Sequence, residues 1–158
     1  MLLPLPSPQP QPHPAPDIEP FEYRLHVPHN PRAVRVARAT LRAALIAHGL
    51  GELAGRAELL AAEMLTNAIT HTTGDAELRL CWSQWGVLRM TVWDTSPRPP
   101  DTRAVHAYDP SSESGRGLRL LQMLADRWDS YILRRDLFDG ASKAVWCEIT
   151  RRVPAAWA

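Results

Sequence analysis

The sequence lacks the residues that several common classes of functional site require. Lys143 is the only lysine among 18 lysine and arginine residues, so no Gly-Lys-Ser/Thr phosphate loop exists. Cys81 and Cys147 are the only cysteines and lie in separate apolar runs. A metal cluster is therefore not expected, and the two residues are predicted to be a buried pair of free thiols in a reducing cytoplasm.

Long hydrophobic runs and an excess of one charge are also missing. No stretch is long and apolar enough to span a membrane, and the N-terminus has no basic segment typical of a signal peptide. The formal net charge of +1 gives no electrostatic footprint for nucleic acid or an anionic membrane. We therefore expect a cytoplasmic protein that binds neither nucleic acid nor membrane directly.

Proline is concentrated at the N-terminus, where residues 1–20 hold eight of the 15 prolines. Proline at nearly every second position removes backbone donors and favours an extended, solvated chain. Residues 1–20 are predicted to be a disordered tail, with a ligand for an aromatic groove as the alternative. Residues 21–152 are expected to form one domain, followed by a short C-terminal tail at 153–158.

Hydrophobic periodicity predicts an alternation of strands and helices within this domain. The expected elements are a strand at 21–27, a helix from about Pro31 to Gly49, a helix at 52–72, strands at 76–83 and 86–94, a loop at 95–114, a helix at 117–128, and strands at 129–136 and 142–150. Their order predicts the α+β class, with one mostly antiparallel sheet covered on one face by helices.

A polar stripe runs along the second predicted helix. Glu63, Asn67 and His71 follow one another at four-residue intervals, and a helix turns about 100° per residue, so the three share an arc of roughly 80°. A solvated face of an amphipathic helix explains this spacing. A binding site is the alternative, because exposed faces usually carry Lys, Arg and Glu rather than the Asn and Thr found here.

Two further features accompany the stripe. Asp94 is in phase with the apolar face of its strand, formed by Leu88, Met90 and Val92, so its carboxylate is predicted either to point toward the layer that covers the sheet or to cap the following turn. The segment "ESGRGL" stands directly before a predicted helix. Its glycines permit close backbone approach, and a helix start offers free N–H groups to an anion.

Together, and in this order, these features resemble the GHKL superfamily of ATPases and kinases, in particular its small bacterial anti-sigma-factor serine/threonine kinases. "ELLAAEMLTNAITH" is similar to the family's N box, "VWDTSPRPP" occupies the place of the first glycine box, "SGRGLRLLQMLADRW" is similar to the second, and "SKAVWCEI" to the closing strand. The resemblance covers residues 21–150 and implies a Bergerat-type two-layer sandwich.

The resemblance also implies roles for individual residues. Glu63 would act as general base, and Asn67 would bind the Mg²⁺ that bridges the phosphates of ATP. Asp94 would accept a hydrogen bond from the adenine amine, and His71 would lie beside the nucleotide. A lid over the phosphates would be formed by Ser114, Gly115, Arg116, Gly117 and Leu118. The sequence departs from the family pattern Asp-x-Gly-x-Gly after Asp94, where Ser96 replaces the first glycine and Pro97 and Arg98 follow.

Three functions follow from this resemblance. The first is a kinase that holds a sigma factor and uses Mg-ATP to phosphorylate a small anti-sigma antagonist protein, with homodimerisation as a family expectation. The second is a non-catalytic regulator, nucleotide-responsive or nucleotide-free, that only sequesters a partner, which the altered glycine box favours. The third is an enzyme that hydrolyses nucleotides.

Overall fold

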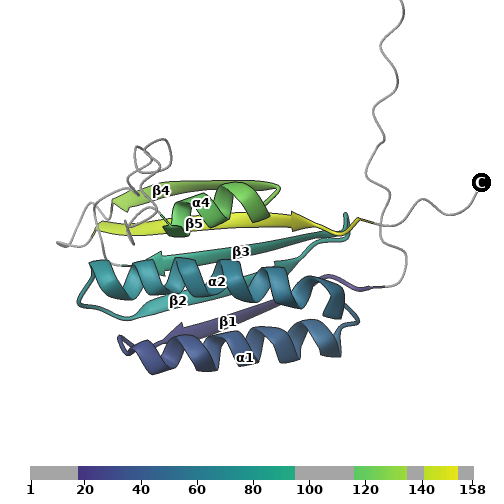
Figure 1. The fold of residues 1–158 in the computed structure, drawn as a ribbon, viewed down its shortest axis with the longest axis horizontal. Helices are drawn as coiled ribbons and strands as arrows, with labels where there is room; N and C mark the ends of the chain where they lie inside the picture. The colour runs from purple at the N-terminus through teal and green to yellow at the C-terminus, as the bar shows by residue number, and fades with distance from the viewer. Residues whose placement is uncertain (1–17, 95–115, 135–140, 153–158) are drawn as a thin grey trace, which may run out of the picture.

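The computed structural model describes residues 18–94, 116–134 and 141–152, which form the helices and strands shown in Figure 1. The elements are β1 (Phe21–Val27), α1 (Pro31–Ala47), α2 (Gly51–His71), β2 (Ala76–Trp82), β3 (Val87–Asp94), α4 (Arg116–Leu124), β4 (Arg127–Arg134) and β5 (Ala141–Thr150). The tail before residue 18 and the loop predicted at 95–114 lie outside the described residues.

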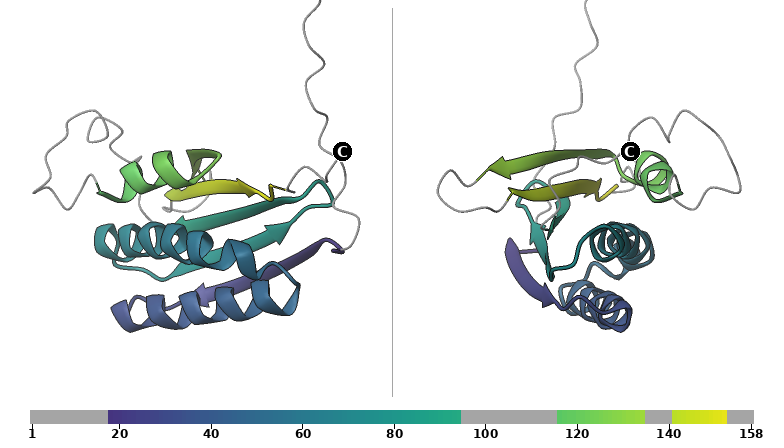
Figure 2. Two further views of the ribbon diagram at one scale, coloured as in Figure 1. Left: turned by 45° about the vertical axis from the view of Figure 1, so that its right-hand side comes forward. Right: turned by 90° about the vertical axis from the view of Figure 1, so that its left-hand side faces the viewer.

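The strands form one five-stranded sheet in the order β1-β2-β3-β5-β4, and every described pairing is antiparallel. The three helices among the described residues lie on the same side of this sheet, which gives two layers (Figure 2). The α+β class and the two-layer sandwich predicted from the sequence are confirmed. None of the described helices is long and apolar enough to cross a membrane.

The hydrophobic core lies between the helix layer and the inner face of the sheet. Alternation along β3 turns Leu88, Met90 and Val92 inward, and each is at most 1% exposed. The opposing surface of α2 includes Leu60, Ala61, Met64, Leu65 and Ala68, all of them buried. Fully burying a side chain of this size stabilises a fold by about 1.5–3 kcal/mol, so this contact fixes α2 over the centre of the sheet.

Helix α1 begins where the sequence predicts and covers the β1 side of the sheet. The Asn30 side chain accepts a hydrogen bond from the Arg32 N–H at 2.9 Å, and Pro31 occupies the first turn, where a missing N–H costs nothing. Ala37, Leu41 and Leu45 form its buried stripe. Gly49, with a φ of 75°, ends the segment in a conformation that favours glycine.

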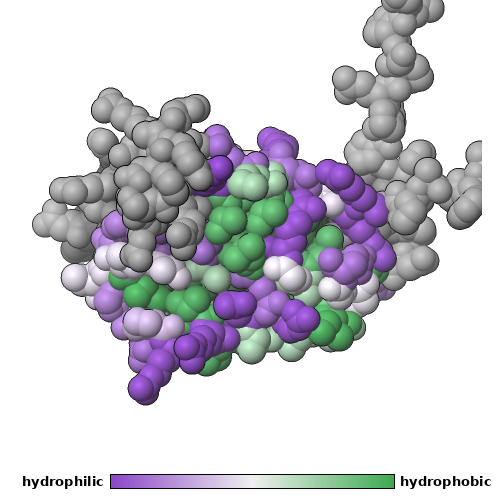
Figure 3. Space-filling view, in the orientation of Figure 1, coloured by the Kyte–Doolittle hydropathy of each residue, from purple (hydrophilic) through white to green (hydrophobic). Residues whose placement is uncertain are grey.

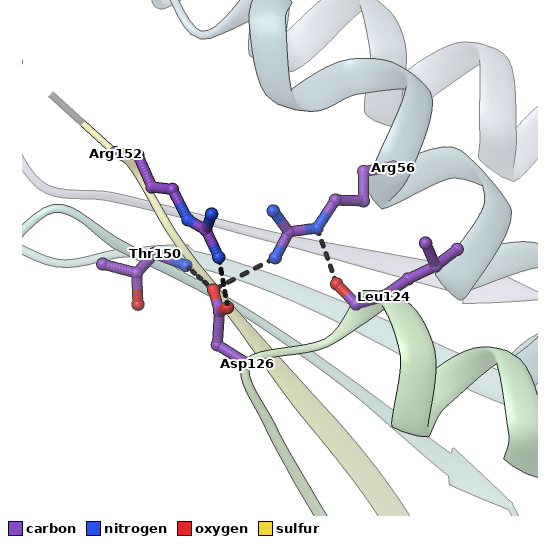
Figure 4. A network of polar contacts seen from close by, with 5 residues as sticks. All are labelled: Arg56, Leu124, Asp126, Thr150 and Arg152. Atoms are coloured by element: carbon purple, nitrogen blue, oxygen red, sulfur yellow. Dashed lines mark hydrogen bonds and ion pairs between the residues drawn. The ribbon is translucent and has the colours of Figure 1, made fainter. Parts of the chain in front are cut away.

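Helix α4 ends earlier than the sequence predicts, at Leu124 instead of residue 128, and β4 begins at Arg127 instead of 129. The reason is the network in Figure 4. Arg56 on α2 donates from Nε to the Leu124 carbonyl at 2.6 Å and contacts the Asp126 carboxylate at 3.0 Å. The Asp126 N–H donates to the Glu148 carbonyl at 2.9 Å, which starts the pairing with β5.

Asp126 completes this network with two contacts at the end of β5. Its carboxylate accepts from the Thr150 N–H at 2.7 Å and lies 4.0 Å from the Arg152 guanidinium (Figure 4). Helical periodicity continued past Leu124, but it could not reveal an arginine from a distant helix competing for the last carbonyl. Tertiary hydrogen bonds thus override the local pattern here.

The two cysteines differ from the predicted buried pair. Both are free, but Cys147 is buried on the inner face, whereas Cys81 is half-buried and paired with Arg89 on the outer face. The prediction is therefore correct for Cys147 and wrong for Cys81, because β2 alternation places Leu80 and Trp82 inward. Burial raises the pKa of the Cys147 thiol to about 12.

The surface of the helix layer mixes polar and apolar side chains (Figure 3). Its large exposed apolar residues include Val36, Ile46, Leu59 and Met123. Exposed hydrophobic residues are ordinary on folded proteins, and these four do not by themselves mark a site.

Candidate functional site

The predicted site residues that the structure describes lie toward one end of the sandwich. At this end β1 and β3 finish, β2 and β5 begin, and α2 terminates (Figure 1). The register places Val27 opposite Ala76 and Asp94 opposite Lys143. His29, just after β1, contacts the carbonyls of Ile69 and Thr72 at the end of α2.

Asp94 closes β3 on the inner face, as its phase in the strand predicts. The residue is 4% exposed, and its carboxylate lies 3.6 Å from the ammonium of Lys143, which is 5% exposed. A carboxylate at this depth strongly prefers charged or hydrogen-bonding partners, because an isolated buried charge is costly. The alternative prediction, that Asp94 caps the following turn, concerns residues from 95 onward, which lie outside the described part of the chain.

The polar stripe on α2 passes from half-buried to exposed positions toward the end of the helix. Glu63 and Asn67 are half-buried, and His71 is exposed. Within the described part of the chain, the side chains of Glu63 and Asn67 make no hydrogen bond or ion pair. These two residues are therefore not part of a fully solvated face. The carboxylate of Glu63 and the carboxamide of Asn67 lie at the border between the helix layer and solvent, where they can form hydrogen bonds with a ligand.

The end of α2 is held by a cluster from the segments that follow β1 and precede β2. The His29 Nε2 donates to the carbonyls of Ile69 at 2.8 Å and Thr72 at 2.7 Å, which satisfies acceptors that a helix end leaves free. Asp75 in turn accepts from the His29 N–H and from the His26 ring. These hydrogen bonds, with the His29 N–H contributing most, lower the pKa of Asp75.

The residues that were predicted to form a lid over the phosphates are only partly described. Ser96, Ser114 and Gly115 lie outside the described residues, while Arg116, Gly117 and Leu118 form the first turn of α4. This turn carries backbone N–H groups that have no partner within the helix, as at every helix start. Leu121, one turn further on, is 1% exposed and anchors α4 in the core beside α2.

The donor groups at this end suit Mg-ATP better than a metal held by the protein alone. Among the residues described, no group of three or more His, Cys, Asp or Glu side chains could hold a metal ion. Mg²⁺ bound with a nucleotide takes most of its ligands from phosphates and water and needs only one or two from the protein. The half-buried carboxamide of Asn67 offers an oxygen of the type that Mg²⁺ accepts.

Sequence reasoning missed Lys143 as a member of this site. Lys143 alternates with Val145, Cys147 and Ile149 on β5, so the inward register that revealed Asp94 also applied to the only lysine of the chain. Sequence reasoning also missed Arg56. In the sequence this residue cannot be distinguished from other arginines on amphipathic helices, because its contact with Asp126 forms only in the folded chain.

Comparisons with known proteins agree with this architecture. One chain of the crystal structure of the SiaB–SiaC complex from Pseudomonas aeruginosa superimposes with a TM-score of 0.63 at 12% sequence identity, covering 80% of this chain and 89% of that chain. This likeness concerns the fold alone. No curated protein sequence matches the chain. The family model of the histidine kinase-like ATPase domain matches residues 27–137, which includes the α2 stripe and Asp94 and makes this chain a member of that family.

Proposed function

We propose that this domain binds Mg-ATP at the end of the sandwich where α2, β3 and β5 meet, and that it is a regulatory serine/threonine kinase of the anti-sigma type. In this proposal Asp94 binds the adenine and Asn67 binds the metal. His71 lies beside the nucleotide, and the start of α4 contacts the phosphates. Membership of the histidine kinase-like ATPase family supports nucleotide binding.

The observation that carries the proposal is the burial of Asp94. Asp94 is 4% exposed at a strand end, on the inner face of the sheet, where it lies 3.6 Å from the Lys143 ammonium and beside the half-buried part of the polar stripe on α2. Burying a carboxylate has a cost even when a charged partner is near. The cost is reasonable at a site where the carboxylate accepts a hydrogen bond from a ligand amine. Buried polar groups of this kind give ligand pockets their specificity.

The proposed chemistry is transfer of the γ-phosphoryl group to a serine or threonine hydroxyl of a partner protein. The hydroxyl oxygen forms the new bond to phosphorus, the bond to the β-phosphate oxygen breaks, and ADP leaves. Glu63 takes the hydroxyl proton, which its half-buried position permits. Mg²⁺ neutralises phosphate charge when bound, and positioning with electrostatic stabilisation accounts for most of the rate in such reactions.

The partners in this proposal are proteins. The kinase would hold a sigma factor and inactivate a small anti-sigma antagonist by phosphorylation, acting as a homodimer. The similar fold in the SiaB–SiaC complex supports a role in binding another protein, because that structure is itself a complex. Neither the sigma factor nor the antagonist is identified by that likeness.

Calorimetric titration of two single variants tests the site. Asn67→Ala removes the metal ligand, so it should weaken ATP binding most strongly when Mg²⁺ is present. Asp94→Asn removes the acceptor for the adenine amine, so it should reduce the preference for ATP over GTP. Each change should lower ATP affinity at least tenfold, or about 1.4 kcal/mol.

Two matched variants serve as controls. Thr66→Ala changes an exposed position next to Asn67 on α2, and Asp129→Asn changes an exposed carboxylate on the outer face of β4. Both should bind ATP like the wild type, and melting curves should show all four variants folded. If the wild type binds ATP but the Asn67 and Asp94 variants bind it equally well, the site is wrongly placed.

A second function is favoured by the residues after Asp94. Ser96, Pro97 and Arg98 replace the glycine-containing pattern that lets the backbone approach the nucleotide. The alternative protein is a regulator of the same fold that sequesters its partner without catalysis. Incubation with labelled ATP and candidate antagonists separates the two, because only the kinase transfers label.

A further inference from the structure

The single lysine of the chain stands beside the carboxylate that is assigned to adenine. Lys143 is the register partner of Asp94 on the neighbouring strand, and both side chains belong to the inner face of the sheet. Lys143 is 5% exposed, and its Nζ lies 3.6 Å from the Asp94 Oδ2. Lysine is among the residues that proteins bury least often, so its position needs an explanation.

Structural stabilisation is a weak explanation for the burial of Lys143. Removing two charges from water costs several kcal/mol, and the attraction between them offsets that cost only when good hydrogen bonds satisfy both groups. The separation of 3.6 Å between Lys143 Nζ and Asp94 Oδ2 exceeds the donor–acceptor distance of N–H···O hydrogen bonds, which is about 2.7–3.2 Å. Within residues 18–94, 116–134 and 141–152, the ammonium of Lys143 makes this ion pair but no hydrogen bond, so its N–H donors remain available.

The pair presents an acceptor and a donor side by side. The carboxylate of Asp94 only accepts, and the ammonium of Lys143 only donates. The Watson–Crick edge of adenine carries the complementary arrangement, an exocyclic amine that donates next to the ring nitrogen N1, which accepts. Adjacent positions on two hydrogen-bonded strands hold the two protein groups in the order that one base edge requires.

We propose that Lys143 is a second base-reading residue, which donates a hydrogen bond to N1 of adenine while Asp94 accepts from the amine. This inference rests on the proposed nucleotide site. It explains why the only lysine is buried at this position, and it extends the recognition of the base from one atom to two. Lys143 is thereby a specificity-determining residue that contacts the ligand.

The same pair rejects guanine held in the same orientation. Guanine has a carbonyl where adenine has the amine, and an N–H where adenine has the N1 acceptor. The carbonyl would face the Asp94 carboxylate and the N–H would face the Lys143 ammonium, so both contacts become repulsive. Sites that pair with both donor and acceptor discriminate more strongly than sites that pair with one, because a mismatch leaves buried groups unsatisfied.

The test uses a change in the ligand together with changes in the protein. ATP and 1-deaza-ATP, in which a C–H group replaces N1, are titrated into the full-length protein with Mg²⁺. The wild type should bind ATP about tenfold or more tightly than 1-deaza-ATP, because a well-made hydrogen bond to a buried charged donor has this effect. In Lys143→Met, which keeps a long apolar chain but has no donor, the ratio should fall to about one.

Lys143→Gln provides a second variant in case the methionine leaves the Asp94 carboxylate too poorly compensated to fold. Its carboxamide keeps a neutral donor that can pair with Asp94, but this donor is one bond closer to the backbone and carries no charge, so its contact with N1 should weaken and the ratio should fall below that of the wild type. Asp129→Asn is the matched control and should keep the wild-type ratio, since Asp129 lies on the opposite face of the sheet. Melting curves establish that each variant is folded.

The outcomes separate this inference from the proposed function. Binding of ATP without discrimination against 1-deaza-ATP overturns the role of Lys143 and leaves the nucleotide site in place. A wild-type ratio that persists unchanged in folded Lys143→Met or Lys143→Gln also overturns it, because another group or a water molecule then reads N1. Absence of ATP binding to the wild type at millimolar concentration overturns both proposals.

Discussion

The two halves of helix α2 use their polar residues in different ways. In the first half, Arg56 is engaged with the Leu124 carbonyl and the Asp126 carboxylate, and Glu52 lies 2.6 Å from the Arg151 guanidinium. In the second half, Glu63 and Asn67 are half-buried and, among the described residues, make no hydrogen bond or ion pair. Engaged polar groups of this kind stabilise the fold, whereas available ones are suited to a ligand.

This difference shows why the same residue types on one helix have different functions. Arg56 ties α2 to the end of α4, the helix whose first turn is assigned to the phosphates. The His29 cluster fixes the other end of α2 through the carbonyls of Ile69 and Thr72. The helix is therefore held at both ends, and the polar stripe between these contacts is presented by a rigid element.

The largest expected effect concerns Glu63. Glu63→Gln keeps the shape of the side chain but removes its basicity, so phosphotransfer should fall by about 10²–10⁴-fold while ATP affinity changes little. The matched control is Glu52→Gln, the same substitution in the other half of α2, which should retain full activity. Phosphotransfer is measured with labelled ATP and the partner protein. Full activity of Glu63→Gln would eliminate Glu63 as the base.

A smaller effect is expected for Arg56. Arg56→Met should reduce the free energy of unfolding by about 1.5–3 kcal/mol, because hydrogen bonds to charged groups contribute this much and the Leu124 carbonyl loses its donor. Urea denaturation measures this change. Arg38→Met is the control for loss of an exposed arginine, here on α1, and it should cost less. Equal losses would mean that the Arg56 network does not hold α4.

The cluster at the other end of α2 should give a modest dependence of stability on pH. The pKa of Asp75 is lowered from its ordinary value of 3.8 by the His29 N–H and the His26 ring, so the folded state favours the carboxylate. Its contribution is present above about pH 4 and is lost as the pH falls below that value. The difference in melting temperature between the wild type and Asp75→Asn should therefore shrink as the pH falls from about 5 to about 3, an interval that brackets the ordinary pKa of an aspartate.

A constant difference across that pH interval would contradict the role assigned to Asp75. His26→Ala distinguishes the two partners of Asp75, since the His29 N–H is the larger cause of the lowered pKa. This variant should keep most of the pH dependence, whereas Asp75→Asn should remove it.

The smallest effect is expected at the N-terminus. Deletion of residues 1–17 should change the melting temperature by at most about 2 °C, because a proline-rich segment with few large apolar side chains has little to bury. Differential scanning calorimetry of the full and shortened chains measures the change. A larger decrease would show that the tail docks on the domain and contributes to its stability.

Much of the fold could be predicted from local patterns in the sequence. Alternation along β3 gave the inward direction of Asp94, and the spacing of Ala37, Leu41 and Leu45 gave the buried stripe of α1. These features depend on the periods of strands and helices, which are properties of the chain itself. The order of the motifs also indicated the family, which the family model confirms.

Other features could not be read from one segment at a time. The end of α4 depends on Arg56, which is 70 residues from Asp126, and the partner of Asp94 depends on the pairing of β3 with β5. The position of Cys81 on the outer face, by contrast, was misjudged although the segment itself shows it, because Cys81 is in phase with Glu77 and Arg79 along β2.

The sequence by itself determined the types of the elements, their order and the chemical groups that the site can offer, because propensity and periodicity act over a few residues. Only the tertiary structure decided which of these groups meet. It placed Lys143 beside Asp94, engaged Arg56 with the end of α4, and left Glu63 and Asn67 half-buried. The physical reason is that burial and hydrogen bonding between distant segments exist only after the chain has folded, when the layers exclude water and bring those segments together.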